Sequence, residues 1–364
     1  MQISDLAKAG CSVWLDDLSR AKLTGTDAHC LPPRIKNSGV VGVTTNPAIF
    51  KAAISDATEY AGDIAALKGK SVEEVITKLT TDDVREACDL FADIYRSSKG
   101  VDGRVSIEVD PRSAHDTAAT VSEGRSLWQI IDRPNVLIKV PATLAGLPAI
   151  TELIGAGISV NVTLIFSIER YVQVIDAYIE GIEIAAKNGL DLSQIHSVAS
   201  FFISRLDTAT DPILKADGGI QATSLLGKAA IANAHLAYEQ FEEEFATSRW
   251  QVLAAQGANA QRPLWASTGV KDPAYDDTRY VLELVAPNTV NTMPQSTLDA
   301  VIDHGVFKGN TIAGKYELAR TVFSQLAELG ISIEKVTADL ESDGVKKFAD
   351  AWNELLDSVK GAMG

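Results

Sequence analysis

The sequence predicts an α/β protein, a (β/α)8 TIM barrel with extra helices that include helices at the C-terminal end. Eight short apolar segments alternate with helical segments, which is the order typical of a parallel barrel. Polar residues collect at the ends of these segments, and 364 residues suffice for one large barrel. The competing fold, a doubly wound sheet, usually has a glycine-rich turn after its first strand, whereas this chain has Asp16-Asp17 there.

The expected strands are short apolar runs rich in β-branched residues, and several end at turn signals such as Asn46-Pro47 and Asp110-Pro111. They are residues 12–15, 40–45, 105–109, 136–141, 159–164, 196–202, 263–267 and, for the eighth, either 280–285 or a segment at Val290.

The expected helices follow from apolar spacing at the helical period and from capping residues. Pro32-Pro33 is expected to interrupt the helical segment before the second strand, and Thr81 is expected to cap a helix over residues 82–96. The helices are a short one within 1–10, most of 48–99, then 115–131, 148–155, 167–188, one near 227–245 and most of 312–364.

No internal repeat, low-complexity tract or flexible linker divides the chain, so we expect a single barrel domain over residues 1–364. An insertion at about residues 206–260 follows the sixth strand, and C-terminal helices occupy about residues 312–364.

The composition limits the function classes. A net charge of −15 argues against a nucleic-acid partner, but a local cluster of donors can still bind a small phosphorylated substrate. No segment resembles a signal peptide or a membrane span, and the three cysteines fit reduced thiols, so a cytoplasmic location is expected. Neither the cysteines nor the five histidines have the spacing of metal ligands, so no metal site is expected.

One lysine interrupts the apolar strand at residues 136–141. An ammonium in such a strand is costly unless it is paired or gives up its proton, and an amine without its proton can attack a carbonyl. Taken alone, Lys139 is more simply a structural lysine that reaches water or forms an ion pair.

Polar residues on the other strands favour the interpretation of Lys139 as a nucleophile. In a barrel the carboxyl ends of all strands meet at one rim, where catalytic groups lie, and burying polar groups there without hydrogen bonds would cost free energy. The polar residues late in the strands are Asp16, Thr44, Asn46, Glu108, Lys139, Asn161, Thr163, Ser200 and Ser267.

A lysine nucleophile implies a Schiff base with a ketone or aldehyde, and its formation and the cleavage of a neighbouring C–C bond need proton transfers. Asp16 and Glu108 are available for these tasks. The structural alternatives are a helix N-cap for Asp16 and an ion pair with Lys139 or Arg112 for Glu108. The adjacent Asp17 should point to the opposite face of the strand.

A phosphate-binding region is expected after the sixth and seventh strands, a common place for one in barrels. Arg205 offers a guanidinium fork, and the segment from Ser267 to Lys271 follows the seventh strand. The alternative for Arg205 is a salt bridge with Asp207 or Asp211.

Four motifs together resemble the signatures of the transaldolase family. They are Val-Gly-Val-Thr-Thr-Asn-Pro at 41–47, Ile-Glu-Val-Asp at 107–110, Leu-Ile-Lys-Val-Pro-Ala-Thr at 137–143 and Asn-Val-Thr-Leu-Ile-Phe-Ser at 161–167. The resemblance implies a Schiff-base barrel enzyme of the pentose phosphate pathway without cofactor or metal. Such an enzyme converts sedoheptulose 7-phosphate and glyceraldehyde 3-phosphate into erythrose 4-phosphate and fructose 6-phosphate.

The resemblance also implies residue roles. Lys139 would form the Schiff base, and Glu108 would act through a water, placed by Thr163, in forming and dehydrating the carbinolamine. Asp16 would take the proton from the C4 hydroxyl as the C3–C4 bond breaks. The substrate-binding residues would be Asn46 and Asn161 for the dihydroxyacetone hydroxyls, Thr44 and Ser200 as supports, and Arg205 and Ser267 for the phosphate.

The chain departs from the family in one motif. Many members have an arginine just after the serine of the seventh strand, where this chain has Thr-Gly-Val-Lys at 268–271, so Lys271 is the candidate replacement. The insertion and C-terminal helices are typical of a longer bacterial subgroup.

Two alternatives remain open. The first is an aldolase that resembles fructose-6-phosphate aldolase, although such relatives are shorter and tend to carry a tyrosine where this chain has Phe202. The second is a catalytically silent barrel that binds sugar phosphates. The oligomeric state, monomer or homodimer, is also open.

Overall fold

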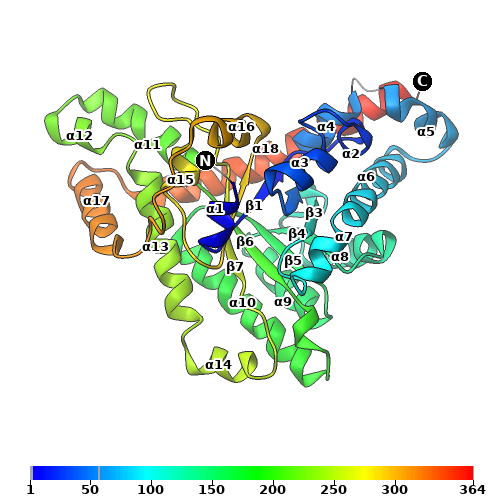
Figure 1. The fold of residues 1–364 in the computed structure, drawn as a ribbon, viewed down its shortest axis with the longest axis horizontal. Coiled ribbons are helices and arrows are strands. Elements are labelled where there is room, and N and C mark those ends of the chain that lie inside the picture. Colours follow the sequence, from blue (N-terminus) through cyan, green and yellow to red (C-terminus); the bar gives the residue numbers. More distant parts are fainter. Residues whose placement is uncertain (1–2, 56–57, 364) are drawn as a thin grey trace.

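A computed structural model describes residues 3–55 and 58–363 of the chain. Eight parallel strands close into a barrel in the order of the sequence, and β1 pairs with β8 to complete it, so the predicted (β/α)8 fold is confirmed (Figure 1). The strands are β1 (Cys11–Asp16), β2 (Gly42–Thr44), β3 (Arg104–Glu108), β4 (Val136–Pro141), β5 (Val160–Ile165), β6 (Ser197–Phe202), β7 (Arg262–Ala266) and β8 (Thr289–Met293).

The helices surround this barrel. They are α1 (Ile3–Lys8), α2 (Arg20–Thr24), α3 (Leu31–Ser38), α4 (Pro47–Ser55), α5 (Ala61–Ala66), α6 (Val72–Leu90), α7 (Ala92–Ser97), α8 (Thr117–Ile131), α9 (Gly146–Gly155), α10 (Ile168–Lys187), α11 (Ser204–Asp217), α12 (Ile220–Leu225), α13 (Ala229–Glu244), α14 (Ser248–Ala254), α15 (Arg279–Leu282), α16 (Gln295–His304), α17 (Tyr316–Glu328) and α18 (Ile333–Ala362). Among the described residues, no helix combines the length and apolarity that a membrane crossing requires.

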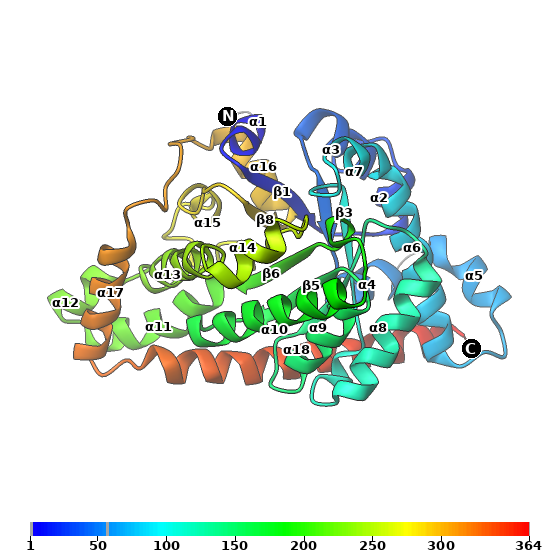
Figure 2. The same cartoon turned by 90° about the horizontal axis from the view of Figure 1, so that it is seen from below.

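The C-terminal helix α18 runs across the molecule from the end near α17 to the end near α5 (Figure 2). It packs on α4, α6 and α11 and reaches the end of β5, where Gly344 lies against Leu164 and Phe166. Because α4 and α11 follow β2 and β6 directly, α18 covers the carboxyl ends of the strands. A segment far from the strands in sequence therefore borders the carboxyl end of the barrel.

Alternating residues divide the barrel interior into layers. An apolar layer is formed by Trp14, Leu137, Val198, Leu264 and Val290, all of which are buried. Two residues further along four of these strands stand Asp16, Lys139, Ser200 and Thr292. The polar residues therefore form a layer nearer the carboxyl ends, and the apolar layer lies beneath it.

Trp14 fits inside the barrel because its neighbour on β2 is a glycine. A Cβ atom added at Gly42 would lie 2.6 Å from the Trp14 ring. The absence of a side chain at position 42 is therefore a packing requirement of the apolar layer.

Two helix boundaries differ from the sequence-based expectation. Thr81 is not an N-cap: it lies inside α6, which begins at a capping box formed by Ser71 and Glu74 and ends before Phe91, so the predicted helix over 82–96 was wrong. The Ser-x-x-Glu pattern at 71–74 was the stronger start signal. Pro32-Pro33 does not interrupt a helix but lies in the first turn of α3, where a missing N–H leaves no bond unmade.

The eighth strand is the segment at Val290, and the alternative at 280–285 was wrong. Residues 279–282 form the short helix α15, although Tyr280, Val281 and Leu282 are all buried. A short buried apolar run has no periodicity that separates helix from strand, which explains the ambiguity.

The apolar layer yields a stability prediction. Gly42→Ala should lower the free energy of unfolding by about 1–3 kcal/mol, because the new methyl group meets the Trp14 ring. The matched control is Gly62→Ala in α5, where nothing lies within 4 Å of the new Cβ and alanine favours the helix, so stability should stay equal or rise. Thermal unfolding midpoints of both variants test this, and an unchanged midpoint for Gly42→Ala would contradict the packing argument.

Candidate active site

A cavity of about 150 Å³ opens at the carboxyl ends of the strands. Nine of the eleven site residues predicted from sequence line it: Asp16, Thr44, Asn46, Lys139, Thr163, Ser200, Arg205, Ser267 and Lys271. The other two, Glu108 and Asn161, do not line it but contact Lys139 and Ser200, which do. The structure thus brings all eleven residues to one end of the barrel.

Lys139 stands at the centre of this arrangement. Its side chain on β4 is only 6% exposed, and its Nζ donates to the backbone carbonyl of Thr45 at 2.8 Å and to Glu108 Oε2 at 3.3 Å. The register pairs Lys139 with Glu108 on β3 and with Asn161 on β5. The ion pair with Lys139 considered for Glu108 is therefore present, whereas Arg112 binds Asp110 instead.

The surroundings of Glu108 give its carboxyl group a pKa suited to proton exchange. Burial raises the pKa of its carboxyl group to about 7, the Lys139 ammonium opposes that rise, and the negative charge of Asp16 adds to it. Its Oε1 is buried without a hydrogen-bond partner among the described residues, as is Thr163 Oγ1. A carboxyl group with a pKa near 7 can both accept and donate a proton at neutral pH.

Asp16 ends β1 and faces the cavity. Its Oδ1 accepts a hydrogen bond of 2.6 Å from Thr44 Oγ1, which also lies 2.6 Å from Thr292 Oγ1. Burial raises the pKa of Asp16, while the Thr44 hydrogen bond and the Lys139 charge oppose the rise. Asp16 does not cap the following helix, because Ser19 is the N-cap of α2, and Asp17 pairs with Lys22 outside the cavity lining.

The two asparagines occupy different positions. Asn161 is fully buried, with its Nδ2 donating to Ser106 Oγ at 3.0 Å and its Oδ1 accepting from Ser200 Oγ at 2.7 Å. Asn46 lines the cavity, and its Oδ1 accepts from the backbone N–H of Ile49 at the start of α4. No hydrogen bond of its amide nitrogen is found among the described residues, so this group is able to donate to a ligand in the cavity.

Positive charge gathers at the other side of the cavity. Arg205 stacks over the rings of Phe202 and Phe166, at 5.2 Å and 6.0 Å from their centroids, and its Nη1 is buried without a partner among the described residues. The considered salt bridges with Asp207 and Asp211 do not form, because these carboxylates accept from the hydroxyls of Tyr280 and Tyr275.

Ser267 and Lys271 follow β7 on the same side as Arg205. Ser267 adopts a left-handed backbone conformation with φ +55°, and its Oγ lies 3.1 Å from the Oγ of Ser204, the residue before Arg205. An unpaired guanidinium with a nearby ammonium and hydroxyl is a combination that binds phosphate.

The lining residues that sequence reasoning did not assign to the site include Thr292 and Phe348. Thr292 follows the same alternation as the other polar strand residues, but the uncertain position of the eighth strand concealed it. Phe348 comes from α18, and its ring lies 5.8 Å from Lys139 Nζ and 6.4 Å from the Phe202 ring. Phe348 belongs to the apolar face of its helix, but apolar spacing carries no signal that a residue reaches a cavity.

Comparisons with known proteins agree with this geometry. A family model described as Transaldolase/Fructose-6-phosphate aldolase matches residues 13–359. The chain is 58% identical over 362 residues to a transaldolase of Renibacterium salmoninarum, covering 99% of this chain and 96% of that protein. It is 57% identical over 364 residues to a transaldolase of Mycolicibacterium smegmatis, covering 99% and 97%, and 56% identical over 360 residues to transaldolase 2 of Streptomyces coelicolor, covering 98% and 96%.

The electrostatics of Glu108 yield a prediction. Its carboxyl group should titrate near pH 7, and Lys139→Met should raise that pKa further, because the Lys139 charge favours the ionised carboxylate. Carbon NMR of protein labelled at the glutamate side-chain carboxyl carbon measures both values, with the resonance assigned by its loss in Glu108→Gln. A Glu108 pKa below about 5, or a fall in the lysine variant, would contradict the assigned causes.

Proposed function

This chain belongs to the transaldolase/fructose-6-phosphate aldolase family, and we propose that it is a transaldolase working through a Schiff base on Lys139. The proposed reaction moves a dihydroxyacetone unit from sedoheptulose 7-phosphate to glyceraldehyde 3-phosphate, giving erythrose 4-phosphate and fructose 6-phosphate. The observation that carries the mechanism is the buried Lys139, with its Nζ 3.3 Å from the Glu108 carboxylate at the edge of the cavity.

The first half of the reaction needs an amine and a proton carrier. The uncharged Nζ of Lys139 attacks the donor ketone, a C–N bond forms, and the resulting carbinolamine loses its hydroxyl group as water to give an iminium ion. Glu108 supplies and removes the protons through a bound water, a role supported by its pKa of about 7. The unpartnered Glu108 Oε1 and Thr163 Oγ1 are the atoms that would hold this water.

Bond cleavage needs a base for the C4 hydroxyl of the donor. We assign this role to Asp16, whose raised pKa makes it a better base than an ordinary aspartate and which Thr44 holds through a 2.6 Å hydrogen bond. As the proton moves to Asp16, the C3–C4 electron pair enters the iminium ion to form an enamine, and the aldose phosphate leaves. The acceptor aldehyde then reacts with the enamine by the reverse steps.

The binding roles follow from the same cavity. Asn46 would bind the dihydroxyacetone hydroxyls, with Thr44 and Ser200 as supporting residues in the same cavity. Asn161 would contribute through Ser200, whose hydroxyl it holds by a hydrogen bond. The phosphate would lie against Arg205, Ser267 and Lys271, with Lys271 in place of the arginine that many members carry. The lack of a salt bridge at Arg205 within the described residues supports this assignment.

The family description also names fructose-6-phosphate aldolase, which would release free dihydroxyacetone. The similar curated proteins are transaldolases, and Phe202, rather than a tyrosine, lines the cavity next to Phe348. Both observations favour transfer to an acceptor over release.

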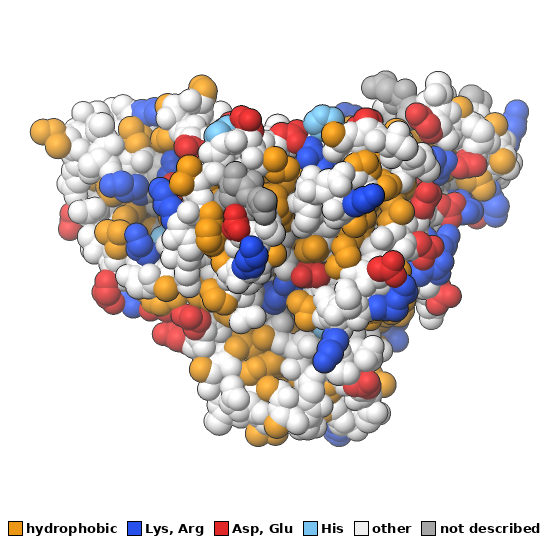
Figure 3. All heavy atoms as spheres, in the orientation of Figure 1, with side chains coloured by type: hydrophobic (Ala, Val, Ile, Leu, Met, Phe, Trp, Pro, Cys, Tyr) orange, Lys and Arg blue, Asp and Glu red, His pale blue; other side chains and the backbone are white. Residues whose placement is uncertain are grey.

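Small sugar phosphates are the proposed partners. Acidic and basic side chains are interspersed on the face shown in Figure 3, and the net charge of −15 is unfavourable for nucleic acid. A cytoplasmic location is supported by Cys11, Cys30 and Cys88, which are buried free thiols.

An activity assay with matched variants tests the proposal. Fructose 6-phosphate with erythrose 4-phosphate should yield sedoheptulose 7-phosphate, and without an acceptor little free dihydroxyacetone should form. Asp16→Asn should lower the transfer rate by about 10²–10⁴-fold, because the base for the C4 hydroxyl is lost. The neighbouring Asp17→Asn, outside the cavity, is the control and should keep most of the activity.

Two results would contradict this assignment. Equal losses in Asp16→Asn and Asp17→Asn would remove the specific role of Asp16. Steady accumulation of dihydroxyacetone at the rate of donor consumption would identify an aldolase instead.

A further inference from the structure

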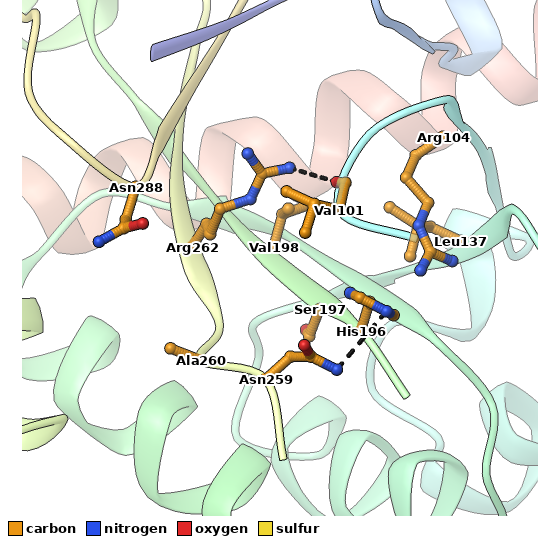
Figure 4. A pocket seen from close by; sticks show the side chains of 10 residues that line it. All are labelled: Val101, Arg104, Leu137, His196, Ser197, Val198, Asn259, Ala260, Arg262 and Asn288. Carbon is orange, nitrogen blue, oxygen red and sulfur yellow. Dashed lines mark hydrogen bonds between the residues drawn. The ribbon is translucent and has the colours of Figure 1, made fainter. Parts of the chain in front are cut away.

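A second cavity, of about 210 Å³, opens at the opposite end of the barrel. Arg104, Ser197 and Arg262, the first residues of β3, β6 and β7, line it together with His196, Asn259 and Asn288 (Figure 4). It shares no lining residue with the catalytic cavity, and the apolar layer that contains Leu137 and Val198 lies between the two. The proposed reaction therefore gives this cavity no role.

Arg104 is the unusual residue of this cavity. It is only 1% exposed, and its Nε and Nη1 donate to the backbone carbonyls of Gly100 and Pro134 at 2.7 Å and 3.0 Å. Its Nη2 has no hydrogen-bond partner, and no carboxylate within 4.0 Å pairs with it among the described residues. The guanidinium also lies 4.9 Å from the centroid of the Tyr95 ring. A buried guanidinium held by neutral carbonyls and an aromatic face is a cation without a counterion, an arrangement that costs free energy.

The nearby charges leave that cation uncompensated. In the view of Figure 4, Arg262 lies on the other side of Val101 from Arg104. Arg262 forms the ion pair with Asp102 at 3.2 Å, so the charge of this carboxylate is already neutralised. Burial and the two arginines lower the pKa of His196 to about 3, which makes it a neutral hydrogen-bonding group at physiological pH. The cavity therefore carries a net positive charge.

Space at the guanidinium depends on a glycine. A Cβ atom at Gly100 would lie 2.7 Å from His196 Nε2 and 3.1 Å from Arg104 Nη2. Any larger residue would thus fill the volume beside the unpaired nitrogen.

We propose that this cavity binds a small phosphate-type oxyanion, either inorganic phosphate or the phosphate group of a small monoester, with Arg104 as its counterion. A guanidinium fork matches the geometry of such an anion. Asn259 Nδ2 and Ser197 Oγ already donate to backbone carbonyls, so the unpaired Nη2 of Arg104 is the donor available to the anion. The exposed Asn288 stands at the mouth. This site is distinct from the catalytic phosphate region and independent of the proposed reaction.

Calorimetric titration with inorganic phosphate at constant ionic strength tests this proposal. The titration uses the Arg205→Gln background, which weakens phosphate binding in the catalytic cavity. This protein should still bind phosphate, and adding Arg104→Gln should weaken that binding by at least about tenfold, the effect of one lost charge-assisted hydrogen bond.

A second variant tests the proposal at an exposed residue and leaves the buried Arg104 unchanged. Asn288→Asp adds a negative charge at the exposed mouth, and aspartate tolerates the observed φ of +57°. It should also weaken phosphate binding by about tenfold through electrostatic repulsion. Asn288→Gly is the neutral control, is compatible with the same backbone angle, and should bind phosphate as the background protein does.

A further arm compares glycerol 3-phosphate with inorganic phosphate. Tighter binding of the monoester assigns the site to phosphorylated metabolites, and tighter binding of inorganic phosphate assigns it to the free ion. The proposal is overturned if the Arg205→Gln protein binds neither probe, or if Asn288→Asp and Asn288→Gly bind phosphate equally well. Transfer activity of the wild-type enzyme is measured separately, so failure of this site leaves the proposed reaction unaffected.

Discussion

The burial of one amine inside the barrel is the constraint on which the rest of the catalytic end depends. Lys139 lies beside the apolar layer of Trp14, Leu137 and Val198, where a charge without partners would be strongly unfavourable. The Thr45 carbonyl and the Glu108 carboxylate supply those partners. The burial of Glu108 itself raises its pKa to about 7, against the lowering effect of the Lys139 charge, so the group that stabilises the amine is also able to exchange protons with a substrate.

Strand alternation connects this pair to the whole fold. Because alternate residues face the interior, an apolar residue on β1, β4, β6 and β8 is followed two positions later by Asp16, Lys139, Ser200 and Thr292. The apolar layer contributes packing, and the polar layer above it contributes hydrogen bonds that no apolar core would need. The apolar layer also separates the two cavities, so Arg104, which has no counterion, lies apart from the acids and the amine at the other end.

Much of this arrangement could be predicted from sequence, because it depends on short-range patterns. Seven strands and the rim positions follow from apolar runs that end in polar residues, and these patterns placed Lys139, Glu108 and Asp16 at one end of the barrel. The eighth strand was ambiguous, since 280–285 and the segment at Val290 are both short and a short run has no periodicity that separates helix from strand, and Thr292 was missed as a consequence. Phe348 could not be placed, because its position depends on how α18 packs over the strands, which its own periodicity does not encode. Arg104 was not singled out from the sequence, since a missing counterion is visible only in three dimensions.

Covalent trapping tests the central claim most directly. Fructose 6-phosphate and sodium borohydride are added to the wild-type protein, and the modified peptide is identified by mass spectrometry. The account predicts one reduced three-carbon adduct, located on Lys139. An adduct on Lys271, the other lysine that lines the cavity, would contradict the assignment, as would the absence of any adduct in folded protein that transfers the three-carbon unit.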